Sequence, residues 1–459
     1  MPQDKSPGLL RQLGIFSATA LVVSNMVGVG IFTTSGFLAG DLGAPSLVLS
    51  IWVVGAVAAL AGAFCYSELG INFPSSGGEY VYLTRAYGPT WGFMTGWVSF
   101  FAGFSAPIAA AALAFSDYLG YFFAGVKQEN AVYTIGSGAL SVKLGGAQIL
   151  ASSLIGAFTL LNFFGVSRVA KIQNFLTATK ILVVLSFIAL GFLAGQGSWD
   201  HFSQPAVRTS SHPVWLQFGI SLFFIYASYS GWNAATYVAE ELRKPERTLP
   251  IALAIGTLLV TLLYVGLNVV FIYGAPLEDM KGVVAVGSLT ARRLFGPGIA
   301  GVFSALMALS LMSTVNAMVT IGPRVYYAMA KNGAFFPVAA RVNRRWHTPV
   351  IAIVTQGVCA MLMTMTPFAG LLMYIGFTLN LFAAMAVASL FVFRRRPGWQ
   401  KLRVVSFAWP LVPLLFLAVG AWTFAMGVRL DPKTSIAAFL TIGTGAAIYH
   451  FGVRPSRQS

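Results

Sequence analysis

Charged residues are scarce in this sequence of 459 residues. Only 9% of it is Asp, Glu, Lys or Arg, whereas 57% is hydrophobic. A soluble protein of this size needs a charged exterior, so the composition excludes an ordinary soluble fold. Hydrophobic runs of about 20 residues, the length that crosses a bilayer, recur from end to end. We therefore expect one membrane domain over residues 1–459, with lipid as its main surroundings.

Cysteine is equally scarce, since Cys65 and Cys359 are the only two. Both lie in hydrophobic runs, which excludes a disulfide framework and predicts free thiols. The sequence also lacks a His-Glu-x-x-His motif, a paired-cysteine metal motif and a Gly-x-x-x-x-Gly-Lys phosphate loop. We therefore predict no enzymatic activity, no metal and no other cofactor.

Acidic residues are much fewer than basic ones, 13 against 29, which gives a net charge of +16. An excess of this size can indicate a nucleic-acid partner. Here, however, the basic residues lie between hydrophobic runs instead of along one polar face. We predict contact with membrane lipid and none with nucleic acid.

Twelve hydrophobic runs are long enough to form helices. The predicted spans are 14–37, 47–69, 91–115, 147–165, 172–193, 214–239, 251–273, 299–321, 350–366, 371–393, 404–427 and 435–453. No small-residue cleavage site follows the first run, so we expect a retained helix instead of a signal peptide. The predicted fold class is an all-α polytopic membrane protein.

An even number of spans places both termini on the same side of the membrane. If that side is the cytoplasm, the inner connections hold 20 of the 29 Lys and Arg and the outer ones hold 8. The positive-inside rule then predicts a multi-pass protein of the cell (plasma or inner) membrane with both termini cytoplasmic. Arg292 and Arg293, in the outer connection 275–298, are exceptions.

The first run is unusual because polar and glycine residues fill its middle, from Ser24 to Ser35. The step from Gly28 to Gly30 costs about 1 kcal/mol per glycine relative to alanine, and it frees backbone groups that hydrocarbon cannot satisfy. Such a break is tolerated where it lines a polar cavity. The alternative is a face of small residues that packs against another helix.

The sixth run is interrupted in the same way at 228–233 (Ser-Tyr-Ser-Gly-Trp-Asn). The two interrupted runs begin successive groups of five helices, as the discontinuous helices of inverted repeats do. Freed N–H groups at the start of a half-helix suit a carboxylate, and freed carbonyl groups at the end of the other half suit an ammonium. This pattern predicts a binding site for a zwitterionic amino acid.

Six sequence segments between about residues 12 and 395 together resemble those of a known family. They are 24–32 (SNMVGVGIF), 65–70 (CYSELG), 76–80 (SGGEY), 230–233 (SGWN), 240–247 (EELRKPER) and 323–333 (PRVYYAMAKNG). The first resembles the first-helix signature of the amino acid–polyamine–organocation superfamily. The others resemble its L-type amino acid transporter branch and the bacterial relatives of that branch.

The resemblance implies a LeuT-like fold that works by alternating access. Helices 1–5 (14–193) and helices 6–10 (214–393) would form a five-plus-five inverted repeat with discontinuous helices 1 and 6. Two peripheral helices (404–453) would follow.

The resemblance also implies a substrate site at the two breaks. The substrate-binding residues it implies are Val27, Gly28, Val29, Gly30, Ile31, Tyr226, Ala227, Ser230, Gly231 and Asn233. The backbone of 27–30 would hold the carboxylate, and the backbone near Ala227 and Ser230 would hold the amine. Asn233 would bind substrate or bridge the broken helices. Relatives carry a gating aromatic where this sequence has Ala227, so we expect Tyr226 or Tyr229 to take over the gate.

Lys180 lies within the fifth run, where an unpartnered lysine costs about 3 kcal/mol or more. Its amine would either snorkel to the interface or act in coupling. By resemblance it matches a fifth-helix lysine beside the first helix, where sodium-dependent relatives bind a cation. A fixed ammonium there would replace Na⁺, and a buried lysine could also carry a proton.

The acidic residues Glu68, Glu79 and 240–241 fall at helix ends, near Arg85, Arg243 and Arg247. We expect most of them to be solvated, with salt bridges at an inner gate as the alternative. No acid is therefore expected near the pocket. The candidates for its wall are small, neutral or apolar: Ala227, Ala234, Ser105, Ala317, Asn380 and Leu381. This wall predicts neutral amino-acid substrates.

The function we predict is sodium-independent exchange of neutral L-amino acids. Proton-coupled symport is the alternative within transport. A channel or sensor on the same scaffold is disfavoured, because channels generally use rings of like residues around a pore. Animal members of the branch pair with a heavy chain through a cysteine between helices 3 and 4. The corresponding segment here, 120–146, has no cysteine, so no disulfide-linked heavy chain is expected.

Overall fold

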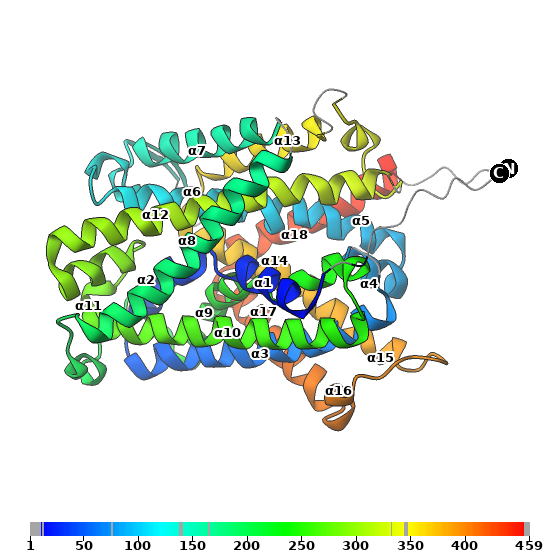
Figure 1. Cartoon of the computed structure of the whole chain (residues 1–459), viewed down its shortest axis with the longest axis horizontal. Coiled ribbons are helices and arrows are strands. Elements are labelled where there is room, and N and C mark those ends of the chain that lie inside the picture. Colours follow the sequence, from blue (N-terminus) through cyan, green and yellow to red (C-terminus); the bar gives the residue numbers. More distant parts are fainter. Residues whose placement is uncertain are drawn as a thin grey trace.

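The computed structural model describes residues 11, 13–74, 77–136, 141–163, 166–331, 333–343 and 348–453. Most of these residues are helical, and the long helices lie roughly along the longest axis of the molecule (Figure 1). Buried hydrophobic side chains from nearly every long helix form the main core, in which α10 packs against α3, and α12 packs against α6 and α8.

The helices and strands have the following bounds. The α-helices are α1 (Ile15–Met26), α2 (Val29–Leu42), α3 (Pro45–Asn72), α4 (Glu79–Tyr87), α5 (Pro89–Val98), α6 (Ala106–Leu119), α7 (Gly146–Phe163), α8 (Val166–Leu193), α9 (Val214–Tyr229), α10 (Pro245–Gly274), α11 (Leu277–Met280), α12 (Val286–Lys331), α13 (Val350–Met363), α14 (Phe368–Ala388), α15 (Leu390–Phe393), α16 (Arg403–Phe407), α17 (Leu411–Leu430) and α18 (Pro432–Ile448). The π-helices are η1 (Ser99–Ser105) and η8 (Tyr449–Val453), and the 3₁₀-helices are η2 (Ala124–Val126), η3 (Gln128–Asn130), η5 (Trp199–Ser203), η6 (Ala234–Glu241) and η7 (Pro337–Ala340). The strands are β1 (Tyr133–Ile135) and β2 (Val142–Leu144).

Nine helices of the described residues are long and apolar enough to cross a membrane, or ten if the bent pair α1 and α2 is one span. Each of the twelve predicted ranges overlaps a helix or a helix pair. The two that do not reach span length are α9 and α13, with 16 and 14 residues. A polytopic helical protein is thus confirmed. The number of twelve crossings and the inverted repeat stay predictions.

Two features of the regular structure were not predicted. Within the mostly helical fold, β1 and β2 pair as a short antiparallel hairpin between α6 and α7. The predicted connection 275–298 is also largely helical, since α12 already begins at Val286. It turns at Gly296, whose φ of 79° suits glycine, so one 46-residue helical segment contains a kink.

The first broken helix divides at Val27 and Gly28, whose backbone is extended, and α1 and α2 are bent by 43° there. The second divides after Tyr229, where Ser230 is extended and Gly231 has a φ of 100°. Its second half, η6, is a 3₁₀-helix, whereas the sequence predicted an ordinary helical continuation to 239. Both breaks fall where the polar, glycine-containing segments predicted them.

Candidate functional site at the two helix breaks

The two breaks contact each other directly. A Cβ atom on Gly30 would lie 2.3 Å from the Ser228 Oγ atom and 2.5 Å from its Cα atom, so only glycine allows this approach. Gly231 likewise faces Asn25, and a Cβ atom on it would lie 2.9 Å from the Asn25 carbonyl carbon. The small residues therefore pack the broken helices together, which was the alternative reading of the first break.

Tyr264 of α10 connects the two breaks. Its hydroxyl oxygen lies 2.5 Å from the Met26 carbonyl oxygen, at the end of α1, and 2.9 Å from the Ser228 carbonyl oxygen, near the end of α9. Thr34 and Ser228 add a buried hydroxyl pair 3.1 Å apart. The single Tyr264 hydroxyl hydrogen is thus within reach of carbonyl groups at the ends of both half-helices, which have no intrahelical partner.

Lys180 of α8 lies against the last turn of α1. Its Nζ atom donates to the Ser24 carbonyl oxygen at 3.2 Å, and the residue is only 2% exposed. The amine does not snorkel to an interface. Within the described residues it takes part in no ion pair, so its charge faces the carbonyl end of a half-helix instead of a carboxylate.

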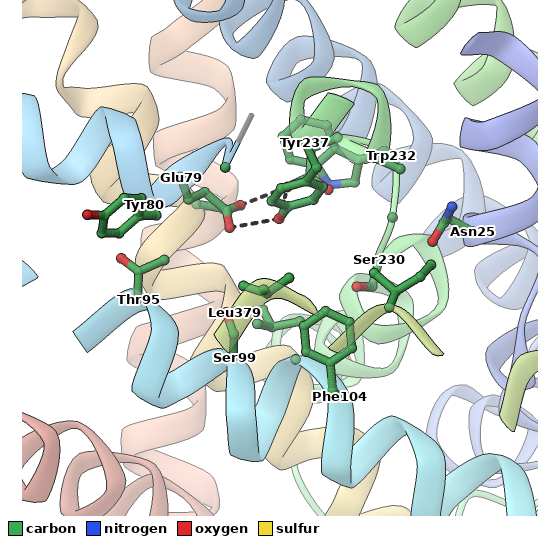
Figure 2. A pocket seen from close by; sticks show the side chains of 18 of the residues that line it. Asn25, Glu79, Tyr80, Thr95, Ser99, Phe104, Ser230, Trp232, Tyr237 and Leu379 are labelled. Carbon is green, nitrogen blue, oxygen red and sulfur yellow. Dashed lines mark hydrogen bonds between the residues drawn. The ribbon is translucent and has the colours of Figure 1, made fainter. Parts of the chain in front are cut away.

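A cavity of about 170 Å³ lies beside the second break. Four predicted substrate-binding residues line it: Tyr226, Ser230, Gly231 and Asn233. Asn25, from the last turn of α1, also lines it. The cavity extends toward α4, with Glu79 and Tyr237 on one side and Phe104 on the facing side (Figure 2).

Several predicted site residues lie outside this lining. They are Val27, Gly28, Val29, Gly30, Ile31, Lys180, Ala227 and Tyr229. Of the two candidates for the gate, only Tyr226 borders the cavity, since the Tyr229 hydroxyl donates to the Trp52 carbonyl oxygen instead. Asn233 does not bridge the broken helices, because its amide donates to Glu79 and Tyr237, at 2.7 Å and 3.2 Å.

The predicted wall was only partly right. Ala234 and Asn380 line the cavity, whereas Ser105, Ala317, Leu381 and Ala227 do not. For Ser105, Ala317 and Ala227, a neighbour one residue away lines the cavity instead: Phe104, Met318 and Tyr226. A shift of one residue turns a side chain by about 100° around a helix, which is enough to remove it from a wall.

Glu79 was wrongly expected to be a solvated charge away from the pocket. It lines the cavity, and its Oε1 atom accepts from the Tyr66 hydroxyl at 2.8 Å and from the Asn233 amide at 2.7 Å. Its Oε2 atom accepts from the Tyr237 hydroxyl at 3.0 Å. Burial raises the pKa of Glu79 above its usual value, although the three hydrogen bonds act in the opposite direction.

The loop before Glu79 explains why its carboxylate lies at the cavity. This position was not predicted from the sequence. Gly77 and Gly78 have φ values of 128° and 48°, and a Cβ atom on Gly78 would lie 2.8 Å from the Tyr237 ring. The two glycines let the chain turn tightly under η6 and begin α4 with the carboxylate at the cavity. In the sequence, the two adjacent glycines of the Ser-Gly-Gly-Glu-Tyr segment are the feature that indicates this tight turn.

Glu68 was also wrongly expected to be solvated, near Arg85, Arg243 or Arg247. It is fully buried and forms a bidentate ion pair with Arg394, with both nitrogen–oxygen distances at 2.6 Å. Trp399 and the backbone of Leu402 also donate to it. The pair joins the end of α3 to the segment that follows α15.

With this geometry established, comparison with known proteins assigns the family. The amino acid permease family model matches residues 13–447. The chain belongs to the amino acid permease family. The resemblance inferred from the six sequence segments is thereby confirmed, and at the level of the family the protein is a multi-pass membrane transporter and not an enzyme.

Relatives of this permease from animals and bacteria align over nearly its whole length. It is 28% identical to the serine/threonine exchanger SteT of Bacillus subtilis (strain 168), covering 98% of this chain and 99% of the relative. It is 27% identical to the large neutral amino acids transporter small subunit 2 of Mus musculus, covering 97% and 81%. It is 28% identical to the b(0,+)-type amino acid transporter 1 of Mus musculus, covering 97% and 88%. Two of the three are amino acid transporters by name, and the third is a serine/threonine exchanger.

Proposed function

We propose that this permease exchanges neutral L-amino acids across the cell membrane by alternating access, without Na⁺. One observation carries the proposal: two broken helices, far apart in the sequence, contact each other beside a cavity that the second break lines. Exchangers among the relatives, such as SteT, support this class of transport.

The substrate carboxylate would bind the N-terminal end of α2. The first N–H groups of a helix have no intrahelical partner and carry a partial positive charge. Those of Val29, Gly30 and Ile31 lie in the first turn of α2, directly after the break. They do not line the cavity in this structure, so substrate binding requires the first break to open toward the cavity. Alternating access supplies such a movement.

The substrate amine would bind carbonyl groups at the second break. In this structure the Ala227 oxygen accepts from the Ser230 N–H at 3.3 Å, and the Ser228 oxygen lies 2.9 Å from the Tyr264 hydroxyl. A carbonyl oxygen has two lone pairs, so each retains one acceptor position. Tyr226, which lines the cavity, is the gate that we propose.

Sodium independence rests on Lys180. Its ammonium group donates to the carbonyl end of α1, so a fixed positive charge already occupies the place next to the first break. Proton-coupled symport is the second candidate, and the same residue favours it, because a buried amine can release and rebind a proton.

Neutral substrates are favoured by the apolar part of the cavity lining. Phe104, Met318, Ile321 and Leu379 line the cavity, and these apolar side chains suit an uncharged substrate side chain. The termini are proposed to be cytoplasmic, on the charge bias alone. No disulfide-linked heavy chain is proposed, because residues 120–146 contain no cysteine and Cys65 and Cys359 are both free thiols.

Uptake into proteoliposomes tests this proposal. Purified protein alone should take up labelled alanine or leucine saturably, and equally well when choline replaces Na⁺. Empty liposomes and protein denatured before reconstitution are the controls. The proposal would be contradicted if uptake required Na⁺ or a co-expressed second subunit. Uptake that never saturates would also contradict it.

A further inference from the structure

Glu79 is a partly buried carboxylate that none of the roles proposed so far uses. It is the first residue of α4, and three neutral groups from other elements surround it: the Tyr66 hydroxyl of α3, the Asn233 amide of the second break and the Tyr237 hydroxyl of η6. Glu79 and Tyr237 lie together on one side of the cavity, and Ser230 lies farther along its wall (Figure 2).

The charge of Glu79 has no cationic partner within the part of the chain that the structure describes. The contrast with Glu68 is informative, since that buried carboxylate has Arg394 as a bidentate partner. No ion pair found in the described residues includes Glu79. An ionised carboxylate whose hydrogen-bond partners are all neutral attracts a cation that can reach it.

A cation in the cavity could reach it. A carboxylate has about four acceptor positions, and three neutral donors fill only three of them. The Oε2 atom accepts one hydrogen bond, from Tyr237, and so keeps a position for another donor. Because Glu79, Ser230 and Gly231 line the same cavity, a single ligand can contact the second break and this carboxylate together.

We propose that Glu79 is a binding subsite for a second positive charge on the substrate, so that amino acids with an ammonium or guanidinium side chain bind in addition to neutral ones. This inference rests on the proposed function, because it extends the substrate range of the same cavity. It replaces the expectation that no acid near the pocket could neutralise a cationic side chain. A guanidinium group suits the subsite well, since it presents several donors in one plane to a carboxylate.

The test compares arginine with citrulline, whose neutral side chain has nearly the same length and shape. Binding of labelled arginine to the purified full chain is measured directly, and each amino acid then competes against labelled alanine uptake in proteoliposomes. The wild-type chain should bind arginine about tenfold or more tightly than citrulline, as expected for a hydrogen bond to a charged group. In Glu79→Gln the preference for arginine over citrulline should fall to about one, and the ratio of the two affinities is the readout because a general loss of binding cancels in it.

Two further variants separate the subsite from a merely structural contact. Glu129→Gln removes an exposed carboxylate in the connection after α6 and should leave the arginine preference unchanged. Tyr237→Phe removes one hydrogen bond that ties α4 to η6 but keeps the charge, so the preference should persist. If Glu79 only joined these elements, Tyr237→Phe would act like Glu79→Gln.

The possible failures are distinct. Alanine uptake without any preference for arginine over citrulline in the wild type would overturn the subsite and leave the proposed function standing. The same holds for a preference that survives in Glu79→Gln. Absence of uptake of every amino acid would contradict the proposed function, while direct arginine binding would still decide for or against the subsite.

Discussion

The Nζ atom of Lys180 lies 3.2 Å from the carbonyl oxygen of Ser24 and joins α8 to the last turn of α1. This contact places a positive charge beside the first helix break. The charge stabilises the negative end of the half-helix dipole.

Lys180→Ala should therefore leave a folded protein that transports poorly. We expect alanine uptake to fall more than tenfold, because the link between α1 and the helix beside it is lost. The measurement is the initial rate of uptake, with monodisperse purification as the folding control. Lys127→Ala, at an exposed lysine in the connection after α6, is the comparison, and uptake in Lys180→Ala equal to it would remove Lys180 from the mechanism.

Gly30→Ala should separate the two broken helices. The added methyl group would lie 2.3 Å to 2.5 Å from Ser228 atoms, and overpacking of this kind costs about 1–3 kcal/mol. We expect a lower thermal midpoint in detergent and little transport. Gly28→Ala is the matched control, because its methyl group would lie 3.6 Å from the nearest atom. Equal effects of the two substitutions would contradict the close contact at Gly30.

The buried pair of Glu68 and Arg394 should contribute strongly to stability only as a pair. Removing one partner, as in Arg394→Met, leaves an uncompensated buried carboxylate and should cost about 3–5 kcal/mol. Glu68→Gln combined with Arg394→Met should recover much of this loss. Thermal unfolding in detergent measures both. A double variant less stable than Arg394→Met would show that the cost arises from lost packing instead.

Arginine binding should depend on pH through Glu79. The carboxylate must be ionised to bind a cation, and burial raises its pKa, so affinity should be full at high pH and decline as the pH falls. The decline should begin above the pH at which an exposed glutamate is protonated. The titratable groups that face Glu79 are the phenols of Tyr66, Tyr82 and Tyr237, which stay neutral in this range. Citrulline binding should not change, and a parallel decline for both ligands would point to a different group.

Both helix breaks could be located from the sequence because they are local. Glycine and polar residues in the middle of an apolar run weaken the helix at that point, and both segments do interrupt helices in the structure. The position of Lys180 beside α1 agrees with what the family resemblance implied.

The arrangement around the cavity could not be read in the same way. Whether Phe104 or Ser105 lines a wall depends on the rotation of a helix within the bundle, and the π-helix η1 that precedes α6 changes that rotation. Glu79 accepts a hydrogen bond from Asn233, 154 positions away in the sequence. Glu68 pairs with Arg394, 326 positions away. No local sequence pattern indicates a partner so far away in the chain, so both acids were wrongly predicted to be solvated.

Counterflow in proteoliposomes tests the central claim most directly. Vesicles are loaded with unlabelled alanine and diluted into labelled alanine, with choline in place of Na⁺ and with equal pH on both sides. We predict transient accumulation of label above its external concentration, driven only by the outward gradient of unlabelled substrate and absent from unloaded vesicles. Label that accumulates only when a Na⁺ or pH gradient is imposed, irrespective of internal alanine, would contradict exchange.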